Sequence, residues 1–299
     1  MKKLISLIVL VIFASFAFVS CDDENETTNG QLTLSITDAP IDNSTVSGVY
    51  ITVTGIQYHT NDKEWHTFDE YEGPQTFNLL ELTNGESALL GSFELTAGTY
   101  TQLRFMLDAP EYGMGNPTSP GCYIDFTDES QEPLFVPSGF QSGWKAVGQF
   151  TVPSNGEVEI TADFDARKSV VETGVTGMYI LKPTIRLIVD NQAGQIAGAV
   201  TNVDTNADIV VFAYEDGAYT DNEASDPVDD MTPRFPNSVT SSIADDTNNY
   251  FLAYLAPITY DLVVTTSVDG DFGQVLGIVE DVVVESNKTT NQPIDLSSL

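Results

Sequence analysis

The sequence predicts an all-β protein in which two antiparallel β-sandwich domains follow an N-terminal signal peptide in tandem. Hydrophobic residues alternate with polar ones in short segments over most of the chain, a pattern that buries one face of a sheet. Turn-forming residues separate these segments at short intervals, as in antiparallel sheets. A polar break near residue 190 divides the strands into two groups, which predicts domains at 31–190 and 195–299.

Residues 1–20 have the order of a secretory signal peptide. Lys2 and Lys3 precede an apolar run from Leu4 to Val19, which is shorter than the about 20 apolar residues of a spanning helix. The segment Phe18-Val19-Ser20-Cys21 resembles a bacterial lipobox, in which the cysteine thiol receives a diacylglycerol. We therefore expect cleavage after residue 20 and a membrane anchor through lipid on Cys21.

Residues 21–30 are expected to form an acidic tether, since no apolar residue occurs between Cys21 and Leu32. The run from Asp22 to Glu26 is similar to the signal that, in some Gram-negative groups, sends lipoproteins to the outer face of the outer membrane. A spacer that merely stays soluble fits the same residues equally well. The predicted location is therefore the bacterial outer membrane, facing outward, with a periplasm-facing anchor as the alternative.

The chain is strongly acidic, with 11 basic and 44 acidic residues and a formal net charge of −33. This balance excludes nucleic acid as a partner, because binding to phosphates requires a basic surface. It suits solubility outside the cell, divalent cations such as calcium, or repulsion from an anionic outer leaflet. Cys122 is the only other cysteine, so a lipidated Cys21 leaves no intramolecular disulfide, and we expect Cys122 to be a small buried residue.

In the first domain, alternation predicts strands at Leu32–Ile36, Val49–Val53, Leu103–Leu107 and Val158–Phe164. One helical segment is expected, at Phe77–Leu82, where it would cap one end of the sandwich before Gly85 ends it.

The second domain has predicted strands at Ile209–Tyr214, Tyr250–Leu255, Tyr260–Thr265 and Asp281–Val284, with an acidic loop from Glu215 to Asp230. About seven strands in about 100 residues are typical of an immunoglobulin-like sandwich.

Five motifs in the first domain together resemble a family of bacterial lipoproteins, domain of unknown function 4382, over about residues 31–189. They are Leu34-Ser-Ile-Thr-Asp38-Ala-Pro40, Asn78-Leu-Leu-Glu-Leu82, Leu95 to Tyr100 with Leu103-Arg104, Asp163-Phe-Asp165-Ala-Arg-Lys-Ser169-Val170, and Leu181-Lys-Pro183. This family has no established activity. Residues 195–299 resemble the carboxypeptidase-regulatory or transthyretin-like sandwiches, near the carbohydrate-binding-like folds, through Gly198-Ala-Val200 and the turn at 255–260. A shared fold does not transfer a ligand, because function lies in particular side chains.

Two pairs of aspartates are candidate acid or calcium sites. Asp163 and Asp165 would lie on one face of a strand, whereas the alternative is a turn in which Asp165 caps backbone amides. Asp269 and Asp271 flank Gly270, which is also a common hairpin connector.

Two other groupings have a weaker chemical case. His59 and His66 would face each other if Tyr58 pairs with Thr67, which suggests a two-histidine metal site, but no third ligand is indicated. The spacing of Asp204, Asn206, Asp208 and Glu215 imitates an EF-hand, but Ile209 stands where that loop requires glycine.

No hydrolase, metalloprotease, phosphate-loop or dinucleotide motif occurs in the sequence, so no catalytic residue is assigned. Aromatic residues in or beside predicted loops are candidates for stacking on sugars: Trp65, Trp144, Tyr112, Tyr123 and Tyr219. The sequence predicts a non-catalytic envelope or surface protein that binds a glycan, a protein or a matrix component. The alternative is an accessory protein or enzyme of extracellular glycan processing that uses an aspartate pair.

Overall fold

The computed structural model describes residues 28–39, 45–60, 64–110, 121–136, 143–174, 177–182, 184–203, 207–227, 229 and 232–299. The predicted signal peptide, Cys21, nearly all of the acidic tether, Tyr112, Asp204 and Asn206 lie outside these residues. Within these ranges the chain is almost entirely strands and turns, which confirms the predicted all-β fold. No helix in the described part is long and apolar enough to cross a bilayer.

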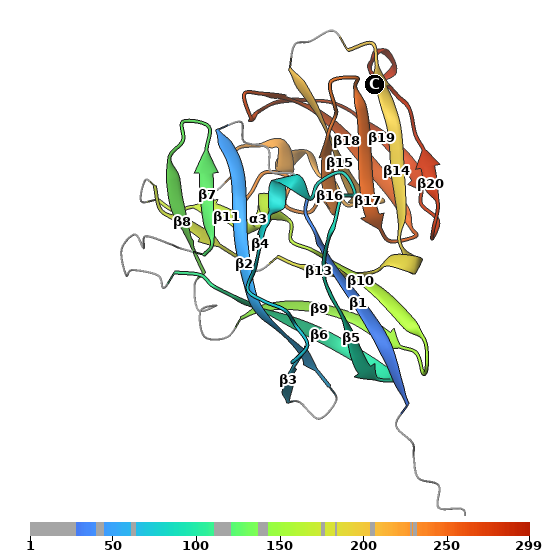
Figure 1. The fold of residues 1–299 in the computed structure, drawn as a ribbon. Coiled ribbons are helices and arrows are strands. Elements are labelled where there is room, and N and C mark those ends of the chain that lie inside the picture. The colour runs from blue at the N-terminus through green and yellow to red at the C-terminus, as the bar shows by residue number, and fades with distance from the viewer. Residues whose placement is uncertain are drawn as a thin grey trace, which may run out of the picture.

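The N-terminal unit, residues 29–189, contains one large sheet (Figure 1). Its strand order is β11-β12-β8-β7-β2-β6-β9-β13-β10-β1-β5, and β3 and β4 also pair with β2. The strands are β1 (Asn29–Thr37), β2 (Val46–His59), β3 (Trp65–Thr67), β4 (Gln75–Asn78), β5 (Ala88–Thr96), β6 (Gly98–Leu107), β7 (Tyr123–Phe126), β8 (Gln131–Phe135), β9 (Trp144–Val152), β10 (Glu157–Asp163), β11 (Val170–Glu172), β12 (Tyr179–Leu181) and β13 (Arg186–Val189).

The long strand β2 holds this sheet together because it changes partners along its length. Its first half pairs with β7 and β4, and its second half pairs with β6 and β3 after a register shift between Val53 and Gly55. One hydrophobic core then receives side chains from both parts of the sheet, including Leu34 of β1 and Ile51 of β2, which are both fully buried. The alternation seen in the sequence corresponds to this buried face.

Some neighbouring strands run parallel, which the sequence did not predict. In the N-terminal unit these pairs are β1 with β10, β8 with β12, and β9 with β13. In the register of β1 and β10, Thr37 lies opposite Asp163. Two segments far apart in the sequence therefore end side by side, close to the C-terminal unit.

The C-terminal unit, residues 194–299, has two four-stranded sheets that pack face to face. One sheet has the order β17-β14-β20 with β21 beside β14, and the other has the order β16-β15-β18-β19. Their strands are β14 (Gly194–Thr201), β15 (Asp208–Glu215), β16 (Thr240–Ile243), β17 (Asn249–Leu255), β18 (Thr259–Val268), β19 (Asp271–Val283), β20 (Thr289–Asn291) and β21 (Ile294–Asp295). Ile196 and Leu252 of the first sheet share a core with Val211 and Leu262 of the second, as expected of a sandwich.

The predicted helix at Phe77–Leu82 is reduced to one 3-10 turn, η1 (Leu79–Glu81). Phe77 instead belongs to β4, where it pairs with Ile51. The side chain of Asn78 caps the turn by accepting from the backbone N–H of Leu80. Four apolar residues in six fit a helical turn as well as a strand end, and the pairing with β2 decides between them.

The remaining turns are short. They are α3 (Ala166–Ser169), η2 (Asp190–Gln192), η3 (Asp221–Ala224) and η4 (Leu296–Ser298). Of these, α3 lies at the boundary between the units and η2 connects them.

Candidate functional site: the cleft between the two units

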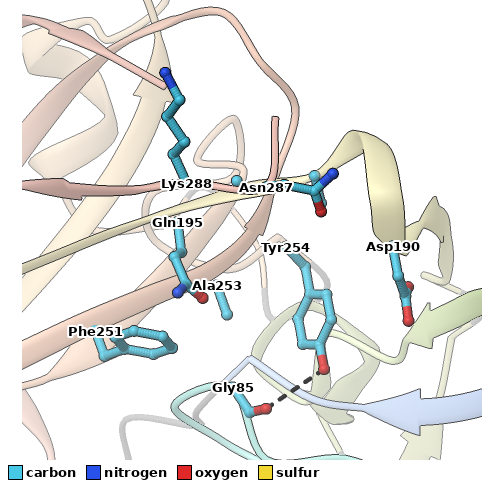
Figure 2. A pocket seen from close by; sticks show the side chains of 10 residues that line it. Gly85, Asp190, Gln195, Phe251, Ala253, Tyr254, Asn287 and Lys288 are labelled. Carbon is cyan, nitrogen blue, oxygen red and sulfur yellow. Dashed lines mark hydrogen bonds between the residues drawn. The ribbon is translucent and has the colours of Figure 1, made fainter. Parts of the chain in front are cut away.

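A cleft of about 320 Å³ lies where the two units meet (Figure 2). The N-terminal unit contributes the turn at Gly85, and the connector η2 contributes Asp190. Ala193 follows η2, and the C-terminal unit contributes Gly194, Gln195, Phe251, Ala253, Tyr254, Asn287 and Lys288. The volume is at the small end of the range for small-molecule sites, about 300–1,000 Å³.

Tyr254 points into this cleft because β17 carries a β-bulge. Gly194 of β14 pairs with Leu255 and Ile196 pairs with Leu252, so Gln195 faces two residues, Ala253 and Tyr254. The backbone of Tyr254 is left-handed, with φ of 55°. That conformation costs an L-residue about 1–2 kcal/mol, and bulges of this kind often redirect a side chain at a binding site.

Two aromatic rings lie close to the turn at Gly85. The hydroxyl of Tyr254 donates to the Gly85 carbonyl at 3.4 Å, as Figure 2 shows. A Cβ on Gly85 would lie 2.5 Å from Cε1 of Phe251, and the φ of Gly85 is +86°. Only glycine therefore lets the N-terminal unit approach Phe251 this closely.

The polar groups of the cleft are mainly amides and one carboxylate. Asp190 accepts a hydrogen bond from the Thr161 hydroxyl at 3.0 Å, whereas its Oδ1 is buried without a partner. Burial raises the pKa of Asp190 above its usual 3.8, and the bond from Thr161 opposes the shift. Gln195 bonds to Thr289 at 2.6 Å, and Lys288 is paired with Glu285 outside the cleft.

This arrangement suits binding better than catalysis. The half-exposed rings of Phe251 and Tyr254 offer apolar faces, and Asp190, Gln195 and Asn287 offer hydrogen-bonding groups around them. Among the described residues that line the cleft, Asp190 is the only carboxylate, and paired acids such as glycoside hydrolysis uses are not found in that part of the lining. The sequence did not indicate this site, because Gly85 is expected there only to end a helix and Tyr254 only to belong to a strand.

The aspartates of the N-terminal motifs meet in a buried charge cluster at the ends of β1 and β10. Asp38, Asp163 and Asp165 are each at most 6% exposed. Arg186 pairs with Asp163, and Lys168 pairs with Asp165 at 3.1 Å. Asp38 accepts from the backbone N–H of Ala166 at 2.7 Å. Burial raises the pKa of Asp38 well above 3.8, the bond from Ala166 lowers it, and the charges of Asp163 and Asp165 raise it further.

The predicted cap at Asp165 is present, because its Oδ1 accepts from the backbone N–H of Lys168 at 3.1 Å. Asp163 and Asp165 are thus engaged with cations and amides, and neither opens onto the cleft. Within the described ranges, no group of three or more His, Cys, Asp or Glu side chains is arranged to hold a metal. Calcium at Asp163 and Asp165 stays a prediction.

Two cationic side chains next to Asp165, those of Arg167 and Lys168, contact the C-terminal unit. The guanidinium of Arg167 donates to the carbonyls of Arg234 and Phe235, at 2.9 and 3.2 Å, and to the Ser238 hydroxyl at 2.7 Å. The ammonium group of Lys168 donates to the carbonyl of Ser238. We call these contacts the inter-unit latch. They place the buried charge cluster in a structural role, since it joins the units.

The second aspartate pair forms a tight hairpin. Val268 pairs with Asp271, so Asp269 and Gly270 are the two connecting residues, and both have positive φ, 52° and 80°. These angles define a type I′ turn, for which Asp-Gly is a preferred sequence. The hairpin accounts for this motif without a metal, and calcium at Asp269 and Asp271 stays a prediction.

The proposed pairing of the two histidines is wrong by one residue. Tyr58 pairs with His66 and His59 pairs with Trp65, so the two histidines project from opposite faces of the hairpin. His66 stacks on Tyr58 with ring centroids 5.3 Å apart, and His59 contacts Trp65 edge-on at 5.2 Å. They cannot share a metal ion in this register. Ile209 lies within β15, as expected if no EF-hand forms there.

The predicted stacking aromatics have different environments. Trp144, the first residue of β9, is 1% exposed and packs on Phe164 in the core, so its predicted role in stacking on a sugar is wrong. Trp65 is half-buried beneath the guanidinium of Arg104, at 3.8 Å from the ring centroid. Half-buried Tyr123 stacks on Tyr50 at 4.5 Å. Tyr219, also half-buried, meets Tyr214 edge-on. Sugar binding by Trp65, Tyr123 and Tyr219 stays a prediction.

Cys122 is buried, and burial raises the pKa of its thiol to about 12. The thiol therefore stays protonated and unreactive at neutral pH, in agreement with its expected role as a small buried residue.

A family model described as domain of unknown function (DUF4382) matches residues 29–183. No curated protein matches the chain. Among solved structures, the chain is similar to the minor pilin GBS52 of Streptococcus agalactiae, with 14% identity over 88% of this chain and 94% of the pilin, and a TM-score of 0.23.

Two other solved structures show similarity at the same level. A family CBM26 module of Amy13K from Eubacterium rectale, in complex with maltoheptaose, is 12% identical over 89% of this chain and 91% of the module, with a TM-score of 0.22. A fimbrial protein from Bacteroides ovatus is 9% identical over 89% of this chain and 49% of that protein, with a TM-score of 0.22. The family match, in contrast, covers both segments that build the charge cluster, apart from Arg186.

Proposed function

The chain belongs to the family described as domain of unknown function (DUF4382), and from this premise we propose that it is a non-catalytic, lipid-anchored protein of the bacterial cell surface. Its ligand is a glycan, bound in the cleft between the two units. The observation that carries this proposal is the position of Tyr254, whose left-handed backbone lies in a β-bulge. Together with Phe251 it presents aromatic faces to a cleft that is lined by amides and one carboxylate. Aromatic faces with a few polar groups are the usual composition of a saccharide site.

The location rests on the sequence and on the direction of β1. The predicted signal peptide and the lipobox-like segment support an anchor at Cys21, a few residues before β1. β1 starts at the end of the N-terminal unit remote from the C-terminal unit and runs toward it (Figure 1). Nine strand residues span about 30 Å at about 3.3 Å per residue. The junction of the two units would therefore lie about 30 Å from the anchored end of β1.

The anchor is tested by Cys21→Ser. Because the tether carries no core residue, the variant should fold normally but appear in the soluble fraction without acyl label. Retention in the membrane fraction at the wild-type level would refute lipid anchoring at this cysteine.

The enzymatic alternative, glycan processing by Asp163 and Asp165, receives no support from the geometry. Both carboxylates are at most 3% exposed and are paired with Arg186 and Lys168. A saccharide would have to displace these cations and open the inter-unit latch. A protein or matrix component, the other ligand considered from the sequence, would need a broader surface than the cleft provides.

Glycan binding is tested on the detergent-solubilised full-length protein with a glycan array, followed by calorimetry. Tyr254→Gly should abolish binding, because it removes the ring, while the glycine adopts the left-handed backbone without strain. The matched control is Tyr254→Phe, which keeps the ring and loses only the long hydrogen bond to Gly85, and it should bind within about threefold of wild type. Unchanged binding by Tyr254→Gly would refute the cleft as the site.

A further inference from the structure

A second hollow lies beside the cleft, on the outer face of the sheet formed by β17, β14 and β20. Its volume is about 480 Å³, and its lining includes Asn84, Ala197, Asn249, Phe251 and Asn291. Phe251 lines both hollows, and the adjacent residues Asn84 and Gly85 line one hollow each. The two hollows are therefore neighbours on either side of one turn.

The two hollows share a surface of β14 and β17, and small residues of β14 make this surface shallow. The alternation of β14 buries Ile196 and turns Gln195, Ala197 and Ala199 to the outer face. Ala197 and Ala199 leave room above the sheet, and Phe251 of β17 is the residue common to both linings. A floor of small residues with a shared aromatic ring and peripheral amides suits a chain of sugar rings, since each sugar ring has an apolar face and equatorial hydroxyls.

The turn between the hollows is rigid. Asn84 and Gly85 both have positive φ, 56° and 86°, and the N–H of Glu86 donates to the carbonyl of Thr83 at 3.1 Å. The Ser242 hydroxyl donates to Oδ1 of Asn84 at 3.2 Å and accepts from the backbone N–H of Phe251 at 3.0 Å. One hydroxyl thus ties the turn to the strand that carries the shared ring, so both hollows keep a fixed spacing.

The charges around the hollows are acidic. Asp190 lines the cleft and Asp245 lines the second hollow. Hydrogen bonds from Asn249 and Thr247 lower the pKa of Asp245, so it stays ionised at neutral pH. Lys288, the one cation among the described residues that line the two hollows, is paired with Glu285. Together with the net charge of −33, this disfavours a ligand that carries carboxylates, such as a uronate chain.

From these observations we infer that the cleft and the second hollow are two adjacent subsites for one neutral oligosaccharide, which straddles the Asn84-Gly85 turn and contacts Phe251 from both sides. This inference rests on the proposed function, because it names the class of glycan that the cleft binds. It adds that the ligand is a chain rather than a single sugar or chain end, and that it is uncharged.

The test measures Kd against chain length with the detergent-solubilised full-length protein. The probes are neutral oligosaccharides of one to six sugars from the α-glucan, β-glucan, xylan and mannan series, with oligogalacturonides as the acidic series. Affinity should rise at least tenfold between the disaccharide and the tetrasaccharide of the preferred neutral series. Ala199→Tyr, which fills the second hollow, should remove that rise and leave disaccharide binding unchanged.

Asn291→Ala gives a second, milder variant of the same hollow, because Asn291 is an exposed residue on β20. It should reduce tetrasaccharide affinity about threefold or more without changing disaccharide affinity. If Ala199→Tyr fails to fold, this variant tests whether the second hollow binds part of the oligosaccharide.

The outcomes separate the two proposals. Equal affinity for all chain lengths, with binding still lost in Tyr254→Gly, would overturn the two-subsite inference and leave the proposed function standing. Binding of oligogalacturonides as tightly as neutral chains would overturn the inference of an uncharged ligand. Failure of every neutral series to bind would overturn both the inference and the proposed function.

Discussion

Arg167 should be the residue on which the joining of the two units depends most. Its side chain is 8% exposed, and its guanidinium makes three hydrogen bonds to the segment 234–238 of the C-terminal unit. Its Cζ also lies 5.4 Å from the ring centroid of Phe212. Arg167→Ala would remove the Arg167 donor from the Arg234 carbonyl and one of several donors from the Phe235 carbonyl, and it would remove one cation next to Asp165.

The size of the effect follows from these contacts. Removing one partner of a buried charged group costs about 3–5 kcal/mol. The lower end applies here, because Lys168 remains paired with Asp165 at 3.1 Å. At about 2–4 °C per kcal/mol for chains of this size, Tm should fall by about 6–12 °C. Proteolysis should at the same time cut the connector near Asn191, giving fragments near 31–190 and 195–299.

The assay is differential scanning calorimetry together with limited proteolysis, and Arg234→Ala is the matched control. Arg234 also donates to a carbonyl, that of Ala224, and lies over the ring of Phe272 at 4.4 Å, but all these contacts stay within the C-terminal unit. The control should lower Tm without exposing the connector. If Arg167→Ala lowers Tm no more than Arg234→Ala does and adds no cut near Asn191, the reasoning about the latch is wrong.

Three further predictions concern pH, strain and calcium. Folding raises the pKa of Asp38, so the folded chain binds this proton more tightly than the unfolded chain does, and stability should fall as pH rises from 3.8 toward the raised pKa. Asp38→Asn should remove this dependence of Tm on pH. Curves of Tm against pH that run parallel for the variant and the wild type would contradict the prediction. Tyr254→Gly should leave Tm unchanged or slightly higher, because relief of about 1–2 kcal/mol of strain offsets the entropy of glycine, about 0.5–1 kcal/mol; a fall above 5 °C would show that the ring stabilises the fold. Asp269 and Asp271 supply few of the six to eight oxygens that calcium binds, about two, so millimolar calcium should raise Tm only slightly more than sodium does at equal ionic strength; an equal rise with both salts, or one unaffected by Asp271→Asn, would exclude this site.

Local patterns predicted the strands well, because alternation is a property of neighbouring residues. The segment Tyr250–Leu255 was expected as a strand, and β17 runs from Asn249 to Leu255. The cap at Asp165 was also foreseen, since its donors lie within four residues of it. Phe77 was misassigned because a run of six residues fits a helical turn and a strand end equally well.

Pairing between strands was not accessible to the same reasoning. A shift of one residue reverses the faces of a strand, and it separates His59 from His66. Trp144 was expected to be available for stacking on a sugar, yet at the start of β9 its side chain lies in the core. The local sequence does not determine which strands are neighbours in a sheet.

The sequence by itself determined an all-β chain, its strand segments, its acidic balance and an N-terminus with the features of a lipoprotein, because each depends on composition or on residues close together. Only the tertiary structure decided that β1 and β10 run parallel, which brings Asp38 to within hydrogen-bond distance of Ala166, 128 positions away. It likewise decided that Gly85 meets Phe251 and that a bulge turns Tyr254 into a cleft between units. These features arise from pairing and packing between segments far apart in the chain. Hydrophobic periodicity specifies which face of a strand is buried but not the neighbour that buries it.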